Sequence, residues 1–417
     1  MSQPNYKRTK FACYAAYFTM SSIFCLPPLL FMTLRETFGI SYTLLGTLVL
    51  VNFCTQLGVD LIFTVFSKKF NTQKVVRIMP LITSAGLVIY ALLPTFFPNI
   101  AYLGLLIGTV IFSVSAGLSE VLLSPVIAAI PSDNPQRDMS TLHSLYAFGV
   151  FFVTVVSTLF LKFCGTEHWM YLTLIFAALP VIAAVLFMIS PMPDMGGAEN
   201  TASTEGTKKR AMGIVLCVAC IFFGSCAENA MSNWVSSYME NALQIDKALG
   251  DLLGMAGFAI LLGLARIGYA KFGKNISRVL LIGMIGATVC YLVVGLSTGV
   301  APAFIACVLT GIFVAMLWPG TLIMMEEKMP GLGVAAYALM AAGGDLGASL
   351  SPQLLGIVTD TVSASSFAAE LGATLNLTAE QIGLKAGMLV TAIFPLLGTV
   401  VVIVAMRYFK KRADERT

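Results

Sequence analysis

The sequence predicts an all-α membrane protein with twelve transmembrane helices arranged as two six-helix bundles. Of its 417 residues, 58% are hydrophobic and only 11% are charged, and the mean hydropathy is +0.87. Soluble domains carry about 25% charged residues, so this composition is typical of a chain embedded in lipid. The apolar residues also occur in stretches of about 20, which is the length that a helix needs to cross a bilayer.

Short polar breaks divide the apolar sequence into twelve candidate spans. A helix rises about 1.5 Å per residue, so each stretch is long enough to cross a hydrocarbon core of about 30 Å. The predicted spans, in order along the chain, are residues 10–34, 42–67, 74–94, 100–130, 139–162, 168–190, 211–239, 247–270, 278–297, 301–325, 333–357 and 384–406.

The distribution of Lys and Arg predicts the orientation of the chain, because these residues are enriched in cytoplasmic loops. If the N-terminus is cytoplasmic, most of the 25 Lys and Arg residues lie on the cytoplasmic side. The opposite side then holds only Arg35, Lys162, Lys247 and Lys385, and Arg266 falls inside a span. We therefore expect a multi-pass protein of the bacterial inner (plasma) membrane with both termini in the cytoplasm.

A polar segment near the middle of the chain predicts a boundary between two halves. Residues 191–210 read PMPDMGGAENTASTEGTKKR, which is Gly-rich, polar and typical of a linker. The expected organisation is an N-terminal bundle at 1–190, a cytoplasmic linker at 191–210 and a C-terminal bundle at 211–417.

The two halves also share a spaced pattern of residues. Glu36, Leu45, Gly46 and Leu48 recur in the same order and at a constant offset as Glu240, Leu249, Gly250 and Leu252. Such ordered matches indicate an internal repeat. Two parallel six-helix repeats are the architecture of a large class of secondary transporters.

Five motifs in the two halves carry a family resemblance. They are SKKFNTQK (67–74), GLSEVLLSPVIAAIP (117–131), LHSLYAFG (142–149), LWPGTL (317–322) and GGDLGASLSPQLLGIVTD (343–360). Together they resemble the fucose:proton symporter-like branch of the major facilitator superfamily, which implies the major facilitator fold and sugar transport. The chain departs from that branch at SSIFCLPPLL (21–30), where the branch carries an Asp in the first helix and this sequence has no acid.

Glu120 is the first candidate for proton coupling. It lies about 15 Å from the cytoplasmic end of the span 100–130, which is near the bilayer centre. A charge at that depth costs about 2.5–3.5 kcal/mol on insertion scales and usually faces a cavity or a partner. The resemblance places Glu120 at the family's helix-four glutamate, which implies proton coupling and substrate contact. The alternative is a protonated Glu hydrogen-bonded inside the bundle.

Asp345 and His143 are further titratable candidates inside predicted spans. Asp345 follows Gly343 and Gly344 near a span centre, where it is either a second proton or ion site or a structural partner for another helix. His143 lies at a position where the resembled family has a cavity-facing polar residue. It either binds substrate and relays protons, or is a structural histidine.

Polar and aromatic residues on several spans are candidates for binding a polar solute. Asn229 and Asn233, in CAENAMSNWVSSYME, share one helix face at i, i+4, as do Asn52 and Gln56. Amides bond hydroxyl groups while rings stack on apolar faces, which suits a sugar; the alternative is polar packing between helices. The predicted substrate-binding set is Glu120, His143, Asn52, Gln56, Glu228, Asn229, Asn233, Trp234 and Trp318.

Four charged residues near the predicted cytoplasmic ends of spans are candidate gate elements: Asp60, Arg266, Lys68 and Lys69. The two lysines are equally what the orientation rule predicts at such a boundary.

The leading hypothesis is secondary transport of a small polar solute by alternating access, as proton-coupled symport. No phosphate-binding loop, metal cluster or activated nucleophile is present in the sequence, so we expect neither an enzyme nor a cofactor nor a metal site. Sodium remains open as the coupling ion. The expected partners are the solute, protons and the lipid bilayer, without nucleic acid, and the expected assembly is a monomer. The alternatives are a metabolite or drug exporter, or a non-transporting membrane receptor.

Overall fold

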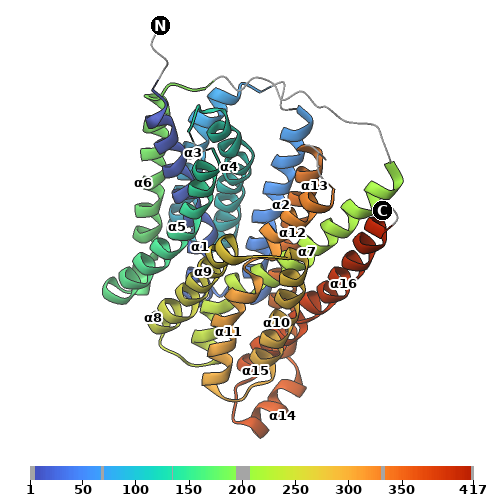
Figure 1. The fold of residues 1–417 in the computed structure, drawn as a ribbon. Helices are drawn as coiled ribbons and strands as arrows, with labels where there is room; N and C mark the ends of the chain where they lie inside the picture. The colour runs from blue at the N-terminus through green and yellow to red at the C-terminus, as the bar shows by residue number, and fades with distance from the viewer. Residues whose placement is uncertain (1–4, 67–69, 134, 194–206, 330–333, 415–417) are drawn as a thin grey trace. The chain divides into compact units, whose positions relative to one another are not determined.

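A computed structural model describes residues 5–66, 70–133, 135–193, 207–329 and 334–414, which are helical apart from short connections (Figure 1). The chain divides into two compact units. Unit 1 contains Met1–Ile40 and Val51–Ala198, and unit 2 contains Ser41–Leu50 and Glu199–Thr417. Ser41–Leu50 was expected in the N-terminal bundle with the rest of its span, but it packs with the C-terminal half.

Among the described residues, unit 1 is built from five long helices and the part of α2 that begins at Val51, joined by short turns. Gly39, at φ 67°, ends the first helix in the left-handed region that glycine adopts without strain, and its N–H bonds the carbonyl of Arg35. The helices are α1 (Lys7–Phe38), α2 (Tyr42–Phe66), α3 (Thr72–Phe96), α4 (Ala101–Ala129), α5 (Pro135–Cys164) and α6 (Trp169–Met188), with short 3₁₀ turns η2 (Pro98–Ile100) and η3 (Thr166–His168).

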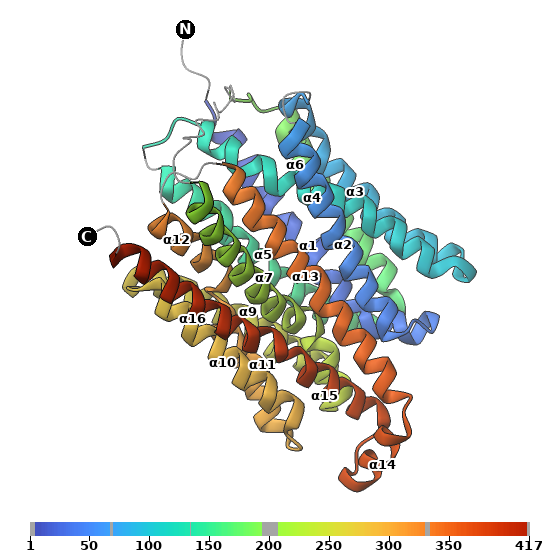
Figure 2. The same ribbon diagram turned by 90° about the vertical axis from the view of Figure 1, so that its right-hand side faces the viewer.

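Unit 2 is more interrupted, because several of its spans consist of consecutive helical pieces (Figure 2). Two of the pieces, η4 and η5, are π-helical. The elements are α7 (Thr207–Ser237), η4 (Tyr238–Ala242), α8 (Lys247–Leu249), η5 (Gly250–Met255), α9 (Ala256–Phe272), α10 (Ile276–Leu296), α11 (Val300–Val314), α12 (Leu317–Lys328), α13 (Val334–Ser363), α14 (Ser366–Leu375), α15 (Ala379–Thr391) and α16 (Ile393–Asp414).

The helices have the length and composition of membrane spans. Among the described residues, ten helices are long and apolar enough to cross a bilayer. The other two predicted spans correspond to α5, whose apolar part is Phe148–Cys164, and to α13, a helix of 30 residues with several glycines, serines and Asp345. The helix α14 was not predicted.

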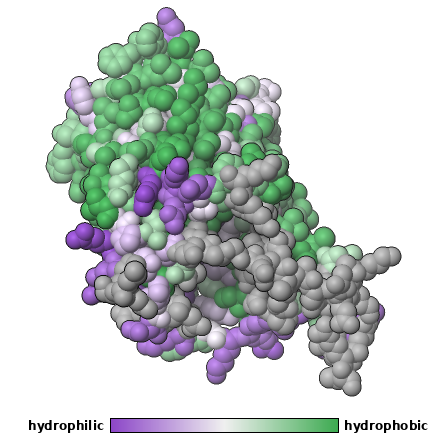
Figure 3. Space-filling view, turned by 90° about the horizontal axis from the view of Figure 1, so that it is seen from above, coloured by the Kyte–Doolittle hydropathy of each residue, from purple (hydrophilic) through white to green (hydrophobic). Residues whose placement is uncertain are grey.

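Large apolar side chains remain exposed on the flanks of the helices. Examples are Ile182 on α6, Leu264 and Ile267 on α9, and Val400 on α16. Figure 3 looks onto the end that carries the N-terminus and shows hydrophobic residues along the flanks with hydrophilic residues near that end. Exposed apolar surface of this extent is unfavourable in water and favourable against lipid.

Glycines allow the helices of each unit to approach closely. In unit 1, a Cβ at Gly86 of α3 would lie 2.5 Å from the backbone nitrogen of Phe112 on α4, and one at Gly108 would lie 2.7 Å from the Cα of Tyr90. In unit 2, a Cβ at Gly347 of α13 would clash with the carbonyl oxygen of Phe222 on α7. Without a hydrophobic driving force between helices in lipid, such close contacts supply much of the packing energy.

We expect Gly347→Ala to destabilise unit 2, because the added methyl meets the α7 backbone rather than a movable side chain. Overpacking of this kind costs about 1–3 kcal/mol. The matched control is Gly268→Ala on α9, where no atom lies within 4 Å of the new Cβ. That change should be neutral or stabilising by up to about 1 kcal/mol. Denaturation of the purified protein in detergent measures both, and equal stability of the two variants would contradict the packing assignment.

Candidate functional site

In unit 1, polar side chains line the contact between α2 and α4. The Oδ1 atom of Asn52 accepts hydrogen bonds from Gln56 Nε2 at 3.0 Å and from Ser113 Oγ of α4 at 2.7 Å. One turn further along, a Cβ at Gly117 would lie 3.2 Å from the backbone of Gln56. Asn52 and Gln56 are both buried, so their predicted place in a cavity wall is instead a contact between two helices.

Glu120 and Asp60 continue this contact by helical periodicity. Glu120 follows Ser113 by seven residues and therefore lies on nearly the same face of α4, and Asp60 follows Gln56 by four residues on α2. Asp60 is 6% exposed, whereas Glu120 is half-buried. We call Asn52, Gln56, Asp60, Ser113 and Glu120 the α2–α4 seam. The sequence predicted Asn52, Gln56 and Glu120 in the substrate-binding set and Asp60 in a gate, and helical periodicity aligns all four along the faces where α2 and α4 meet.

In unit 2, Glu228, Asn229 and Ser232 form a half-exposed polar face on α7. Helical geometry places the three within about 100° of arc. We call these three residues the α7 polar face. The amide nitrogen of Asn229 donates to the carbonyl and the hydroxyl of Ser225 at 3.1 Å each, and Asn233, which is buried, donates to the carbonyl of Asn229 at 2.8 Å. The donor groups of both predicted amides are therefore engaged within α7.

Arg266 of α9 bonds two groups in unit 2. Its Nη2 atom lies 3.2 Å from Glu228 Oε1, and its Nε donates to the carbonyl of Ala315 at 2.8 Å. The Ala315 carbonyl lacks an intrahelical donor because the residue four positions on is Pro319, which has no N–H. The sequence predicted Arg266 in a gate and Glu228 in the substrate-binding set, and the structure pairs them.

The other predicted residues of unit 2 lie along α13 and its neighbours. Trp234 is fully buried, donates from Nε1 to the carbonyl of Pro352 at 3.1 Å, and is therefore a packing residue rather than an exposed ring. The ring of Trp318 lies against Gly344, next to Asp345 in the chain, and Asp345 is 3% exposed. Gly343 and Gly344 allow Val218 and Trp318 to approach, as expected from the sequence.

Three predicted residues lie outside what the structure describes. The side chain of His143, on α5, is one, and Lys68 and Lys69 are the others. Within the described part of the chain, no three His, Cys, Asp or Glu side chains gather closely enough to hold a metal ion.

The structure also shows a contact that the sequence reading missed. The carboxylate of Asp360 on α13 accepts hydrogen bonds from the backbone nitrogens of Tyr42 at 3.2 Å and Thr43 at 2.6 Å. It thereby caps the N-terminus of α2 from a distant part of the chain. The hydroxyl of Tyr42 bonds Glu380 of α15 at 2.6 Å, and its ring packs on Trp234. This contact explains why the first turns of α2 belong to unit 2.

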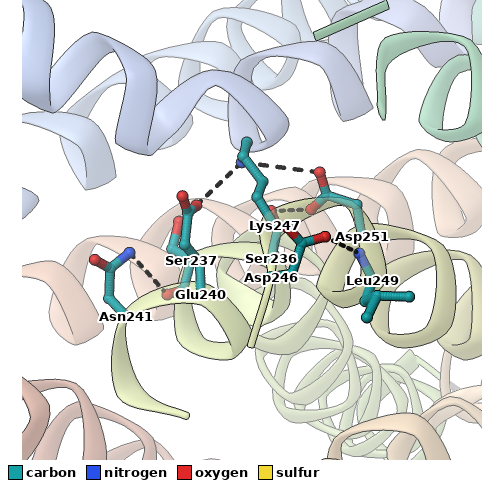
Figure 4. Close-up of polar contacts among 8 residues, drawn as sticks. All are labelled: Ser236, Ser237, Glu240, Asn241, Asp246, Lys247, Leu249 and Asp251. Carbon is teal, nitrogen blue, oxygen red and sulfur yellow. Dashed lines mark hydrogen bonds and ion pairs between the residues drawn. The ribbon is translucent and has the colours of Figure 1, made fainter. Parts of the chain in front are cut away.

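A second polar cluster surrounds Lys247 where α7 connects to α9 (Figure 4). The ammonium of Lys247 lies 3.2 Å from Glu240 and 3.8 Å from Asp251 of η5, whose carboxylate also accepts from Ser236 of α7. At the same end of unit 2, Lys385 is buried and donates to the carbonyl of Ser297 at 2.7 Å. From the sequence, both lysines were expected on the side opposite the cytoplasm, and in the structure both bond groups of unit 2.

Comparison with known families identifies the relationship of the chain. A family model described as Major Facilitator Superfamily matches residues 11–352. A search of curated proteins finds no match.

Solved structures of transporters share the fold. The D-xylose–proton symporter superimposes with a TM-score of 0.73 at 14% identity, over 93% of this chain and 96% of that one. A bacterial homologue of the human lysosomal transporter Spinster, in an inward-facing and occupied conformation, gives 0.72 at 15% identity over 99% of both chains. The fucose:proton symporter of E. coli gives 0.59 at 13% identity, over 96% of this chain and 99% of that one. At such identities the similarity is one of fold.

We expect Asp360→Ala to destabilise the start of α2, because it leaves the N–H groups of Tyr42 and Thr43 without their acceptor. An unsatisfied buried donor costs about 1–3 kcal/mol. The control is Glu370→Ala, which removes an exposed carboxylate from α14. Chemical denaturation in detergent should show the loss for the first variant only; an unchanged free energy of unfolding for Asp360→Ala would show that the cap contributes nothing.

Proposed function

The chain belongs to the major facilitator superfamily and is a secondary transporter, not an enzyme, and we propose that it carries a small polar solute together with protons by alternating access. The observation on which this proposal rests is the half-buried carboxylate of Glu120 in a transmembrane helix, on the face of α4 that packs against α2. A group of this kind is rare in a membrane span unless it has a function.

The chemistry of Glu120 suits a proton site. Transfer of the ionised carboxylate into lipid costs about 2.5–3.5 kcal/mol. The neutral acid can instead be stabilised by hydrogen bonds. Gaining a proton therefore favours states in which the residue is sealed from water, and losing it favours states in which it is hydrated. A carrier that alternates between such states moves the proton with its solute.

Asp345 is the candidate for a second proton site. It is 3% exposed on α13, beside the Gly344 position on which the ring of Trp318 lies. Because residues 21–30 of the first helix include no acid, a proton route in this protein needs a different second carboxylate, and Asp345 is the acid near the centre of the predicted span 333–357. We propose that Glu120 and Asp345 share proton coupling, one in each unit.

The α7 polar face supports binding of a polar solute. Glu228, Asn229 and Ser232 are half-exposed although most of α7 is buried against other helices of unit 2. Carboxylate, amide and hydroxyl groups in that arrangement can accept and donate to the hydroxyl groups of a sugar-like molecule. Several transporters with the same fold are named for polar solutes, among them xylose, fucose and nucleosides, which supports this class.

The Asp360 contact, which lies within unit 2, restricts how α2 can move. The first turns of α2 belong to unit 2 while the rest of the helix belongs to unit 1. Rigid-body movement of the units therefore requires α2 either to bend near Leu50 or to release its N-terminus from Asp360. With both termini in the cytoplasm, as proposed from the Lys and Arg distribution, this contact lies at the outer ends of the helices.

We expect Glu120→Gln to abolish proton-driven accumulation while it leaves solute exchange intact, because Gln keeps the shape and hydrogen bonding of the neutral acid. In one-proton symport, a pH difference of about one unit supports up to about tenfold accumulation, since about 1.4 kcal/mol corresponds to a factor of ten. Uptake and counterflow into proteoliposomes measure the two activities.

The control for this experiment is Glu370→Gln, at an exposed carboxylate on α14. That variant should accumulate solute like the unmodified protein. Full proton-driven accumulation by Glu120→Gln would refute the coupling role of Glu120, whereas loss of counterflow as well would assign Glu120 to solute binding.

A further inference from the structure

Arg266 is a cation within the helices of unit 2. Proton coupling by Glu120 and Asp345 does not explain its presence there. It lies in α9, within two positions of the exposed apolar residues Ile267 and Leu264, yet its side chain is directed to α7 and to the break between α11 and α12. An arginine inside a membrane bundle is expected to pair with a charge or to bind one.

The backbone break at Ala315 determines the orientation of this guanidinium. Pro319 cannot donate to the Ala315 carbonyl, and the Nε of Arg266 supplies the missing hydrogen bond at 2.8 Å. With Nε held on one side, the Nη2 group reaches Glu228 Oε1 at 3.2 Å. The planar guanidinium is therefore positioned by the chain before any ligand arrives, which is the condition for selective binding.

The pair with Glu228 uses only part of the hydrogen-bonding capacity of both residues. Glu228 Oε2 is buried and has no hydrogen-bond partner among the described residues. No described acceptor meets the Nη1 group of Arg266, whose side chain is 35% exposed. A purely structural ion pair in this setting is expected to be more fully satisfied, since uncompensated polar groups in low dielectric are costly.

We propose that Arg266 is the binding residue for the carboxylate of the transported solute, and that the solute is a hydroxylated monocarboxylate such as a sugar acid. This inference rests on the proposed function as a solute transporter. A guanidinium recognises a carboxylate through two parallel hydrogen bonds, a geometry that suits Arg and not Lys. On the same face of α7 as Glu228, the amide oxygen of Asn229 and the hydroxyl of Ser232 can accept hydrogen bonds from the hydroxyls of the solute.

Glu228 acts in this proposal as the resident carboxylate with which the solute competes. In the absence of solute it compensates the charge of Arg266, which keeps the cation stable inside the helices. The solute carboxylate takes over the guanidinium when it binds. Replacing Glu228 by Gln removes the competitor and keeps the side-chain shape, so binding of the acid should become tighter.

Thermal unfolding of the purified protein with matched pairs of probes tests the proposal. The probes are D-gluconate against D-glucose, D-galactonate against D-galactose and D-xylonate against D-xylose, all at equal ionic strength. At least one acid is expected to raise the unfolding temperature while its neutral sugar does not, because ligands that bind the folded state stabilise it. Stabilisation by a neutral sugar equal to that by its acid, or no shift with any of the three acids, overturns the proposal.

Two variants separate binding from structure. Arg266→Lys keeps the charge and should weaken acid binding by about tenfold or more, since the paired hydrogen bonds are lost. The control Arg278→Lys, at an exposed position at the start of α10, should bind the acid normally. Glu228→Gln should lower the stability of the free protein and show a larger acid-induced shift than the unmodified protein. A purely structural pair predicts lower stability in Glu228→Gln with no enlarged shift, and that result would overturn the role of Arg266.

Different results would contradict the Arg266 binding proposal and the proton-coupling proposal. If a neutral sugar is accumulated with protons and Glu120→Gln abolishes that accumulation, symport stands and the Arg266 proposal fails. If an acid binds through Arg266 but no proton-driven uptake occurs in proteoliposomes, the binding proposal stands and the coupling proposal fails.

Discussion

The absence of water inside a bilayer is the constraint on which this structure depends. Each backbone and side-chain polar group must be satisfied by the protein itself, so the described chain forms helices and directs many of its Ser, Thr and Asn side chains to the carbonyls of the preceding turn. At Pro319, which removes a backbone donor, a side chain supplies the missing hydrogen bond. Arg266 does so at Ala315, and this one requirement aligns a cation with Glu228.

The same constraint explains why the helices of each unit meet at glycines and small polar residues. Apolar side chains gain little by leaving lipid for a protein contact, so close backbone approach and hydrogen bonds must hold the helices together. Gly347 against Phe222 is one example, and the hydrogen bond from Ser351 to the carbonyl of Cys226, one turn further along α13, is another. A hydrogen bond from Ser113 of α4 to the amide oxygen of Asn52 likewise joins α2 to α4, while the amide of Gln56 bonds Asn52 within α2.

The first turns of helix α2 belong to unit 2, and the rest of the helix belongs to unit 1. Its start is capped by Asp360 and packed against α13, whose Gly356 allows the backbone of Tyr42 to approach, while its remainder packs in unit 1. This cap comes from a residue more than three hundred positions further along the chain. In the predicted internal repeat, the connection from α7 to α9 corresponds to the connection from α1 to α2. The charges around Lys247 hold the α7–α9 connection within unit 2.

The sequence by itself determined the helical class, the approximate positions of the spans and the presence of acids and an arginine at membrane depth, because apolar length and charge depletion are local properties. It did not predict that Arg266 meets Glu228, that Asp60 and Glu120 continue one helix contact, or that Asp360 caps α2. Only the tertiary structure decided these, because each pairing joins residues on different helices. Helical periodicity places residues on a face, but which face meets which neighbour depends on how all the helices pack together.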